Sequence, residues 1–305
     1  MIKEFFDEVK EDIDRASTVE YTGKVDRVIG MTVEAIGPIV NVGDMCKIYS
    51  ADGSESAYAE VVGFKEEKVL LMPLGNMGGI GPGNKVVAVG KGFGVPVGEG
   101  LKGRILNALG EPMDGKERIR PEAFYEMDRD PPNPLSRKRI SEILPIGVKV
   151  IDGLLTMGKG QRMGIFAGSG VGKSTLLGMI ARGSEADINV IVLSGERGRE
   201  VLDFVEKNLK AEGLAKSVVI VATSDQPAML RIKSCMAGTA IAEYFRDKGY
   251  NVMLMMDSLT RFAMAQREVG MAIGEPPVAR GYTPSVYSKL PRLLERSGTS
   301  EKGSI

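Results

Sequence analysis

Apolar side chains recur at three- and four-residue spacing through about the first fifteen residues of the chain. Carboxylates and lysines fill most of the positions between them, which is the pattern of an amphipathic helix; the apolar positions are Ile2, Phe5, Phe6, Val9 and Ile13. Such a helix either packs on its own domain or binds a partner protein, and the residues alone leave both possibilities open.

The pattern changes to short apolar runs broken by glycines between about Tyr21 and Gly92. Several short strands at close spacing, with turn signals between them, predict a small barrel or sandwich. A connector with the sequence DRDPPNPLSRKRI follows at residues 128–140. Its cations stand beside prolines, so we expect a solvated loop there rather than a nucleic-acid patch.

Continuous apolar runs follow from about Arg162. Because they are continuous rather than alternating, they predict strands that are buried on both faces; they are RMGIFA (162–167), NVIVLS (189–194), SVVIVAT (217–223) and NVMLMMD (251–257). Helix-like segments begin between them at Lys173, Gly198 and Gln226. This alternation predicts an α/β fold in which helices cover both faces of a mostly parallel sheet.

Composition narrows the possible functions without selecting one. The 305 residues carry 40 basic and 40 acidic side chains, so no net charge points to nucleic acid or an anionic membrane. The chain has no histidine, which excludes histidine bases and histidine metal sites. Cys46 and Cys235 are far apart and predict buried small residues of a reduced protein. The sequence shows neither a signal-peptide pattern nor a run of about 18 apolar residues, so we expect a cytoplasmic protein.

A glycine-rich segment after the first continuous run carries the clearest chemical signal. The sequence AGSGVGKST at residues 167–175 matches a phosphate-binding loop (P-loop), except that Ala167 stands where the strict pattern has its first glycine. Backbone N–H groups and the dipole of the following helix would surround phosphate oxygens there. Lys173 would reach the β- and γ-phosphates, and Ser174 would bind Mg²⁺. The predicted ATP site comprises Gly168, Ser169, Gly170, Val171, Gly172, Lys173, Ser174 and Thr175.

Two carboxylates follow buried runs directly and would lie at the same edge of the sheet. Asp257 ends the last run about eighty residues after the loop, where a Walker B acid would hold Mg²⁺; alternatively, it caps the helix that begins at Leu259. Glu196 follows the second run, where a carboxylate can orient the water that attacks the γ-phosphate; alternatively, it forms a surface pair with Arg197 or Arg199.

These motifs together resemble one family, from about residue 20 to the last residue. AGSGVGKST, GERGREV, MDSLTRFAMAQREVG and GEPPVARGYTPSVYSKLPRLLERSG are similar to the ATPases of flagellar-type protein export, which are related to the catalytic subunits of F-type rotary ATPases. The resemblance implies ATP hydrolysis with catalytic residues Lys173, Glu196 and Arg197, and Mg²⁺ at Ser174 and Asp257. Non-catalytic rotary subunits lack the glutamate, so Glu196 favours hydrolysis over nucleotide binding alone.

The resemblance also implies a domain order and a set of partners. Residues 1–20 would be a helix for a stator-like regulatory protein, 21–92 a β-barrel, and 93–305 a RecA-like P-loop NTPase core with a mostly parallel sheet. The chain would form a homohexamer that also binds a central-stalk protein, export-gate membrane proteins and complexes of export substrates with chaperones. It would work in the cytoplasm, peripherally attached to the inner face of the plasma membrane.

One departure from the family concerns the end of the sequence. The chain stops at EKGSI, where the family continues into another core strand and a helical domain that carries the arginine finger. An arginine finger contributes roughly 10³–10⁵ in rate. We therefore expect residues 1–305 to bind nucleotide but to hydrolyse it slowly.

Alternative functions remain open at this point. The motifs also fit the ATPase of a virulence type III secretion system, and less well the catalytic subunit of an F-type synthase. A hexameric RNA translocase is disfavoured because the barrel lacks the aromatic platform on which single strands stack. A nucleotide-binding protein with little hydrolysis is the alternative from a different class.

Overall fold

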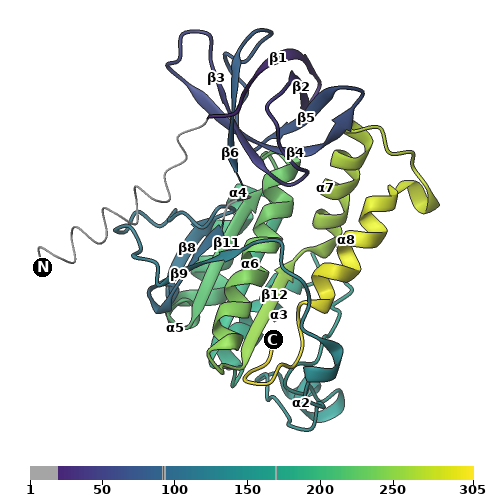
Figure 1. The fold of residues 1–305 in the computed structure, drawn as a ribbon. Helices are drawn as coiled ribbons and strands as arrows, with labels where there is room; N and C mark the ends of the chain where they lie inside the picture. The colour runs from purple at the N-terminus through teal and green to yellow at the C-terminus, as the bar shows by residue number, and fades with distance from the viewer. Residues whose placement is uncertain (1–19, 91, 93, 169) are drawn as a thin grey trace, which may run out of the picture. The chain divides into compact units, whose positions relative to one another are not determined.

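The computed structural model of this chain describes residues 20–90, 92, 94–168 and 170–305. It divides into two compact units, Met1–Lys91 and Gly92–Ile305 (Figure 1). The predicted N-terminal helix lies outside the described residues, so its role as a partner-binding segment stays a prediction.

The first unit is a closed antiparallel barrel. Its strands follow the order β1-β2-β5-β4-β3-β6, with the bounds Thr22–Ile29 (β1), Thr32–Ile36 (β2), Met45–Tyr49 (β3), Ser56–Lys65 (β4), Lys68–Pro73 (β5) and Lys85–Gly90 (β6). Alternate β4 residues, Ala57, Ala59 and Val61, are buried, as the two-residue period of a strand requires. Of the two architectures that the short runs predict, the barrel is confirmed, and its closure pairs every strand on both sides.

A parallel sheet forms the centre of the second unit. Its strands follow the order β12-β10-β11-β8, with the bounds Val252–Asp257 (β12), Ile188–Glu196 (β10), Ser217–Thr223 (β11) and Arg104–Asn107 (β8). The first three strands are the predicted buried runs, and the α/β fold class is confirmed. β8 is too short to give an apolar run, and the sequence pattern did not predict it. A separate antiparallel pair joins β7 (Gly94–Val97) to β9 (Ala123–Glu126).

Helices cover both faces of this sheet, as the continuous apolar runs predict (Figure 1). On one face, Leu177 and Ile180 of α3 pack in the same core as Ile191 of β10. On the other face, α6 lies so close that a Cβ on Gly238 would stand 2.2 Å from Val192. The helices are α2 (Lys149–Leu154), α3 (Lys173–Gly183), α4 (Gly198–Asp203), α5 (Lys210–Ala215), α6 (Ala228–Asp247), α7 (Leu259–Ala272) and α8 (Pro284–Glu295). A π-helical segment spans Phe204–Leu209, and short 3₁₀ turns lie at Glu99–Leu101, Pro134–Ser136 and Ala279–Gly281.

The prediction of a buried strand at residues 162–167 is wrong. This segment belongs to no strand, and the side chain of Phe166 is 98% exposed. A strand needs a partner whose backbone satisfies its N–H and C=O groups. Within the described part of the chain, no strand pairs with this segment; instead the segment and β12 line the same cavity, of about 730 Å³. Apolar composition alone therefore did not place it in the sheet.

Cys46 and Cys235 are both free and buried, which confirms that they serve as small core residues. Burial also raises the pKa of both thiols to about 11, which makes them poor nucleophiles at neutral pH. Among the helices that the structure describes, none is long and apolar enough to cross a bilayer.

Candidate active site

The phosphate-binding loop connects the exposed segment 162–168 to α3. Gly170 and Gly172 have φ values of 74° and 97°, which side chains other than glycine rarely adopt. A Cβ on either residue would meet no atom within 4 Å, so the space beside these two glycines is open in the described chain. α3 begins at Lys173, which directs the positive end of its dipole toward the loop. Ser174, Thr175, Gly168 and Val171 are exposed, and Ser169 lies outside the described residues.

Lys173 contacts the acid at the end of β12. Its Nζ lies 2.5 Å from Asp257 Oδ1, and the two side chains are 31% and 5% exposed. The alternative in which Asp257 caps α7 is wrong, because Ser258 is the N-cap and its Oγ accepts from the Arg261 N–H at 3.4 Å. Asp257 therefore caps no helix, and it forms an ion pair with the lysine of the loop.

Glu196 ends β10, the strand next to Asp257. A bulge at Gly195 shifts the register between Ser194 and Glu196, which redirects the strand end. Burial, followed by the charge of Asp257 and a hydrogen bond with Glu200, raises the pKa of Glu196 from 4.5 to about 7. A carboxyl group with such a pKa exchanges protons near neutral pH, which suits a general base.

The backbone conformation at this strand end requires a glycine at position 195. Its φ is +76°, and a Cβ would stand 3.0 Å from Cβ and Cγ of Arg261. We expect Gly195→Ala to lower the free energy of unfolding by about 1–3 kcal/mol, from backbone strain and displacement of Arg261. Denaturant unfolding monitored by circular dichroism measures this. Gly198→Ala is the control, because a Cβ there meets no atom within 4 Å and the change should stay within about 0.5 kcal/mol. Equal losses in the two variants would contradict the expectation.

Arg197 does not join Lys173 and Asp257. Its Nη1 lies 2.8 Å from Glu200 Oε1, and these side chains are 67% and 40% exposed. The hydrogen bond from Arg197 is the largest cause that lowers the pKa of Glu200. The surface pair that we considered for Glu196 thus exists, but Glu200 is the acid that forms it, and a catalytic role for Arg197 stays a prediction.

Lys173, Glu196 and Asp257 line the same cavity of about 730 Å³. Arg261, in the first turn of α7, lines it too, and sequence reasoning missed this cation. No local spacing signals it, because Asp257 ends a strand and Arg261 lies on the helix that follows. The remaining lining is largely apolar, from residues 157–167, from β12 and from the end of α8. Among the described residues, no group of three or more acidic or cysteine side chains could hold a metal ion unaided.

The fold and the convergent charges define a P-loop nucleotide-binding protein, and comparison with known families agrees. Residues 147–305 match the nucleotide-binding domain of the ATP synthase alpha/beta family, and residues 25–90 match the beta-barrel domain of the same family. The chain belongs to the ATP synthase alpha/beta family.

Its similar proteins are ATPases of flagella and type III secretion. The chain is 56% identical over 294 residues to the flagellum-specific ATP synthase of Bacillus subtilis, covering 96% of this chain and 67% of that protein. It is 53% identical over 283 residues to the type 3 secretion system ATPase of Xanthomonas euvesicatoria, covering 93% and 64%. The chain thus spans about two thirds of the length of these relatives.

A solved structure also resembles this chain over both units. The assembled ATPase EscN from the type III secretion system of enteropathogenic E. coli matches with a TM-score of 0.84 and 45% identity, covering 93% of this chain and 68% of that one. A structure of assembled EscN with its central stalk EscO matches with a TM-score of 0.86 and 46% identity, covering 93% and 69%.

Proposed function

We propose that this chain binds Mg-ATP and hydrolyses it to ADP and phosphate, to energise flagellar-type protein export and flagellum assembly. The observation that carries this proposal is the meeting of Lys173, Asp257 and Glu196 at one cavity. The strand ends of a parallel sheet and the start of a helix supply these residues, which is where α/β proteins bind nucleotides. Relatives with about 50% identity that are named flagellar and type 3 secretion ATPases support it.

The residues present fit a Mg-triphosphate. Mg²⁺ takes one or two carboxylates together with substrate phosphates and a hydroxyl, and Asp257 and the exposed Ser174 supply these groups. When bound, Mg²⁺ neutralises charge on the β- and γ-phosphates. The exposed backbone of Gly168, Gly170 and Gly172 would bind phosphate oxygens.

Lys173 would exchange its contact with Asp257 for the β- and γ-phosphates. This exchange leaves Asp257 free for the metal, and so couples phosphate binding to metal binding. Glu196 would orient the attacking water and accept its proton at a carboxylate oxygen. Because the transition state of phosphoryl transfer is loose, orientation and charge account for most of the rate.

We also propose the assembly and the location of this protein. The names of the relatives support a ring of identical copies with a central-stalk protein, because EscN is described as assembled and in complex with its stalk EscO. The first twenty residues would bind a stator-like regulator, and export-gate proteins and substrate–chaperone complexes would be further partners. The protein would act in the cytoplasm at the inner face of the plasma membrane.

Calorimetric titration of residues 1–305 with ATP, with Mg²⁺ and with EDTA, tests the proposed site. We expect Mg²⁺ to tighten binding by about tenfold or more in the wild type, the effect of one charged metal contact. In Asp257→Asn we expect this gain to fall to about threefold or less, because a neutral amide replaces the metal-binding carboxylate. Asp187→Asn is the control, since Asp187 accepts from the Asn251 N–H at the opposite end of the sheet. Equal gains in all three proteins would argue against Asp257 as the metal ligand, and absence of wild-type binding would refute the proposed function.

A further inference from the structure

The C-terminal end of α8 is bound by arginines from three other segments. The last carbonyl groups of a helix have no partner within the helix, and cations are favoured beside them. Here the carbonyls of residues 294–297 all accept hydrogen bonds from arginines, namely Arg162 to Leu294 (2.9 Å), Arg137 to Glu295, Arg246 to Arg296 (3.0 Å) and Arg137 to Ser297 (2.9 Å). We use the name arginine node for the three donors, Arg137, Arg162 and Arg246, together with Arg296, Glu243 and the carbonyl groups of residues 294–297.

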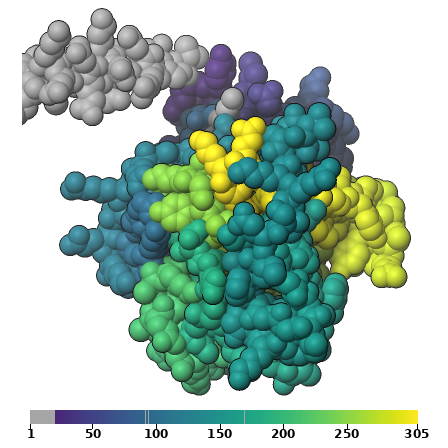
Figure 2. Space-filling view, turned by 90° about the horizontal axis from the view of Figure 1, so that it is seen from below, coloured from purple at the N-terminus to yellow at the C-terminus, as the bar shows by residue number. Residues whose placement is uncertain are grey.

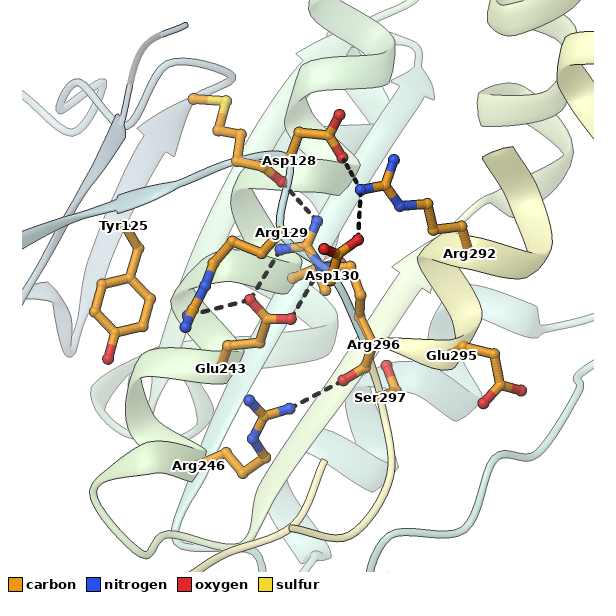
Figure 3. A network of polar contacts seen from close by, with 12 residues as sticks. Tyr125, Asp128, Arg129, Asp130, Glu243, Arg246, Arg292, Glu295, Arg296 and Ser297 are labelled. Carbon is orange, nitrogen blue, oxygen red and sulfur yellow. Dashed lines mark hydrogen bonds and ion pairs between the residues drawn. The ribbon is translucent and has the colours of Figure 1, made fainter. Parts of the chain in front are cut away.

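A buried ion pair fixes the arginine node to α6. Arg296 donates to both carboxylate oxygens of Glu243 at 2.9 Å, and the two side chains are 3% and 1% exposed. Arg296 also donates to the Met127 carbonyl at 2.6 Å, and Arg129 lies 3.5 Å from the same glutamate. Figure 3 shows Glu243 between Arg129 and Arg296, with Arg246 below Glu243 and its guanidinium directed toward the Arg296 carbonyl. A bidentate pair in this environment holds the helix end in one geometry.

α6 in turn is packed on the strands that carry the catalytic acids. It lies against β10, which ends at Glu196, and against β12, which ends at Asp257. The position of the node is therefore fixed relative to these two carboxylates. The segments around residues 160 and 299 pack closely beside the node, because a Cβ on Gly160 would stand 2.5 Å from Thr299. In Figure 2 the C-terminal residues, in yellow, lie between segments coloured teal and light green.

Arg162 is the member of the node that lies at the start of the phosphate-loop segment. Its Nη1 lies 2.9 Å from the Leu294 carbonyl and 2.9 Å from Glu295 Oε1. Beyond it, residues 163–168 form no strand pairing within the described part of the chain. The side chain of Arg162 is thus the polar contact that anchors this segment six residues before Gly168.

We propose that Arg162 is a positioning residue for ATP binding, which holds the phosphate-binding loop at its distance from Glu196 and Asp257 through the arginine node. This inference rests on the proposed function. The hydrogen bonds of Arg162 go to the end of α8 rather than to the loop residues, so it acts by limiting where the loop can lie. Preorganisation of this kind changes ligand affinity without changing the groups that contact the ligand.

Titration of residues 1–305 with Mg-ATP tests this role. We expect Arg162→Gln to weaken binding by about threefold to fivefold, because its pair with Glu295 is 46% and 53% exposed and contributes at most about 1 kcal/mol, and Arg162→Lys to recover part of the loss by keeping the charge. Arg292→Gln is the matched control: Arg292 lies in the last turn of α8, pairs with the exposed Asp128 and Asp130, and its loss should change affinity by less than about twofold.

Hydrogen exchange of the amides in residues 163–172 provides a second readout that needs no nucleotide. We expect faster exchange in Arg162→Gln than in the wild type and in Arg292→Gln, with equal thermal midpoints. Unchanged affinity and unchanged exchange in Arg162→Gln would overturn the inference while wild-type binding upholds the proposed function. If the wild type does not bind Mg-ATP, the proposed function fails, and the exchange rates alone decide whether Arg162 anchors the segment.

Discussion

Lys173→Ala is expected to lower the affinity of this chain for Mg-ATP by at least about a hundredfold. Lys173 would make two charge-assisted hydrogen bonds to the β- and γ-phosphates, at about 1.5–3 kcal/mol each, and a loss of about 3 kcal/mol already exceeds a hundredfold in Kd. The side chain is 31% exposed, so its ammonium group can move from Asp257 to the phosphates without a rearrangement of the core. Calorimetric titration measures the change.

Lys207→Ala is the matched control for this experiment. Lys207 forms an ion pair with Asp203 on the surface, where the side chains are 71% and 55% exposed, and its removal should leave Kd within about twofold. Both variants should keep the far-ultraviolet circular dichroism of the wild type. An affinity of Lys173→Ala within about threefold of the wild type would show that the loop lysine does not bind phosphate.

Glu196→Gln is expected to keep nucleotide binding and to slow hydrolysis by about 10²–10⁴, the usual contribution of a positioned base. The wild-type rate should rise as the pH increases through about 7, because Glu196 has a pKa raised to about 7 and must be ionised to accept a proton. The variant should lose this dependence. Phosphate release under single-turnover conditions measures both, since such conditions detect slow reactions.

The pH dependence of the free energy of unfolding provides an independent test of the raised pKa of Glu196. Its pKa lies above the ordinary 4.5, so the folded chain binds more protons than the unfolded chain between about pH 4.5 and 7, and stability contributed by Glu196 falls as pH rises across this range. Glu196→Gln should remove this slope. Glu206→Gln, at an exposed position on the following helical turns, should change neither the rate nor the slope. A normal rate in Glu196→Gln would refute its assignment as the acid that activates water.

The sequence predicted the strands whose burial follows from local composition. The runs at 189–194, 217–223 and 251–257 correspond to β10, β11 and β12, because strands covered on both faces are apolar throughout. The run at 162–167 is also largely apolar, but no strand pairs with it in the described chain. Pairing is a property of two segments, so a pattern within one segment does not decide it.

The candidate site likewise combines residues that local sequence predicts with residues that only the packing of distant segments brings in. Lys173, Glu196 and Asp257 each follow a motif or a strand end, and the sequence therefore predicted their meeting at one edge. Arg261 enters the site through the approach of α7 to Gly195, which depends on a left-handed backbone and on packing between distant segments. The arginine node joins residues more than a hundred positions apart, and no local spacing predicts such contacts.

The free backbone of β12 has a consequence for handling this protein. One outer side of the sheet is protected, because residues 111–113 pair with β8 and include Pro112, which cannot donate to a further strand. On the other side, only Val252 of β12 is bonded, to the Ser304 carbonyl at 2.8 Å, within the described chain. An unpaired strand beside an apolar wall recruits other extended chains. In samples of residues 1–305, the second unit, rather than the closed barrel, is therefore where aggregation would start, and the solution conditions for concentrated samples of this chain should be chosen to protect that edge.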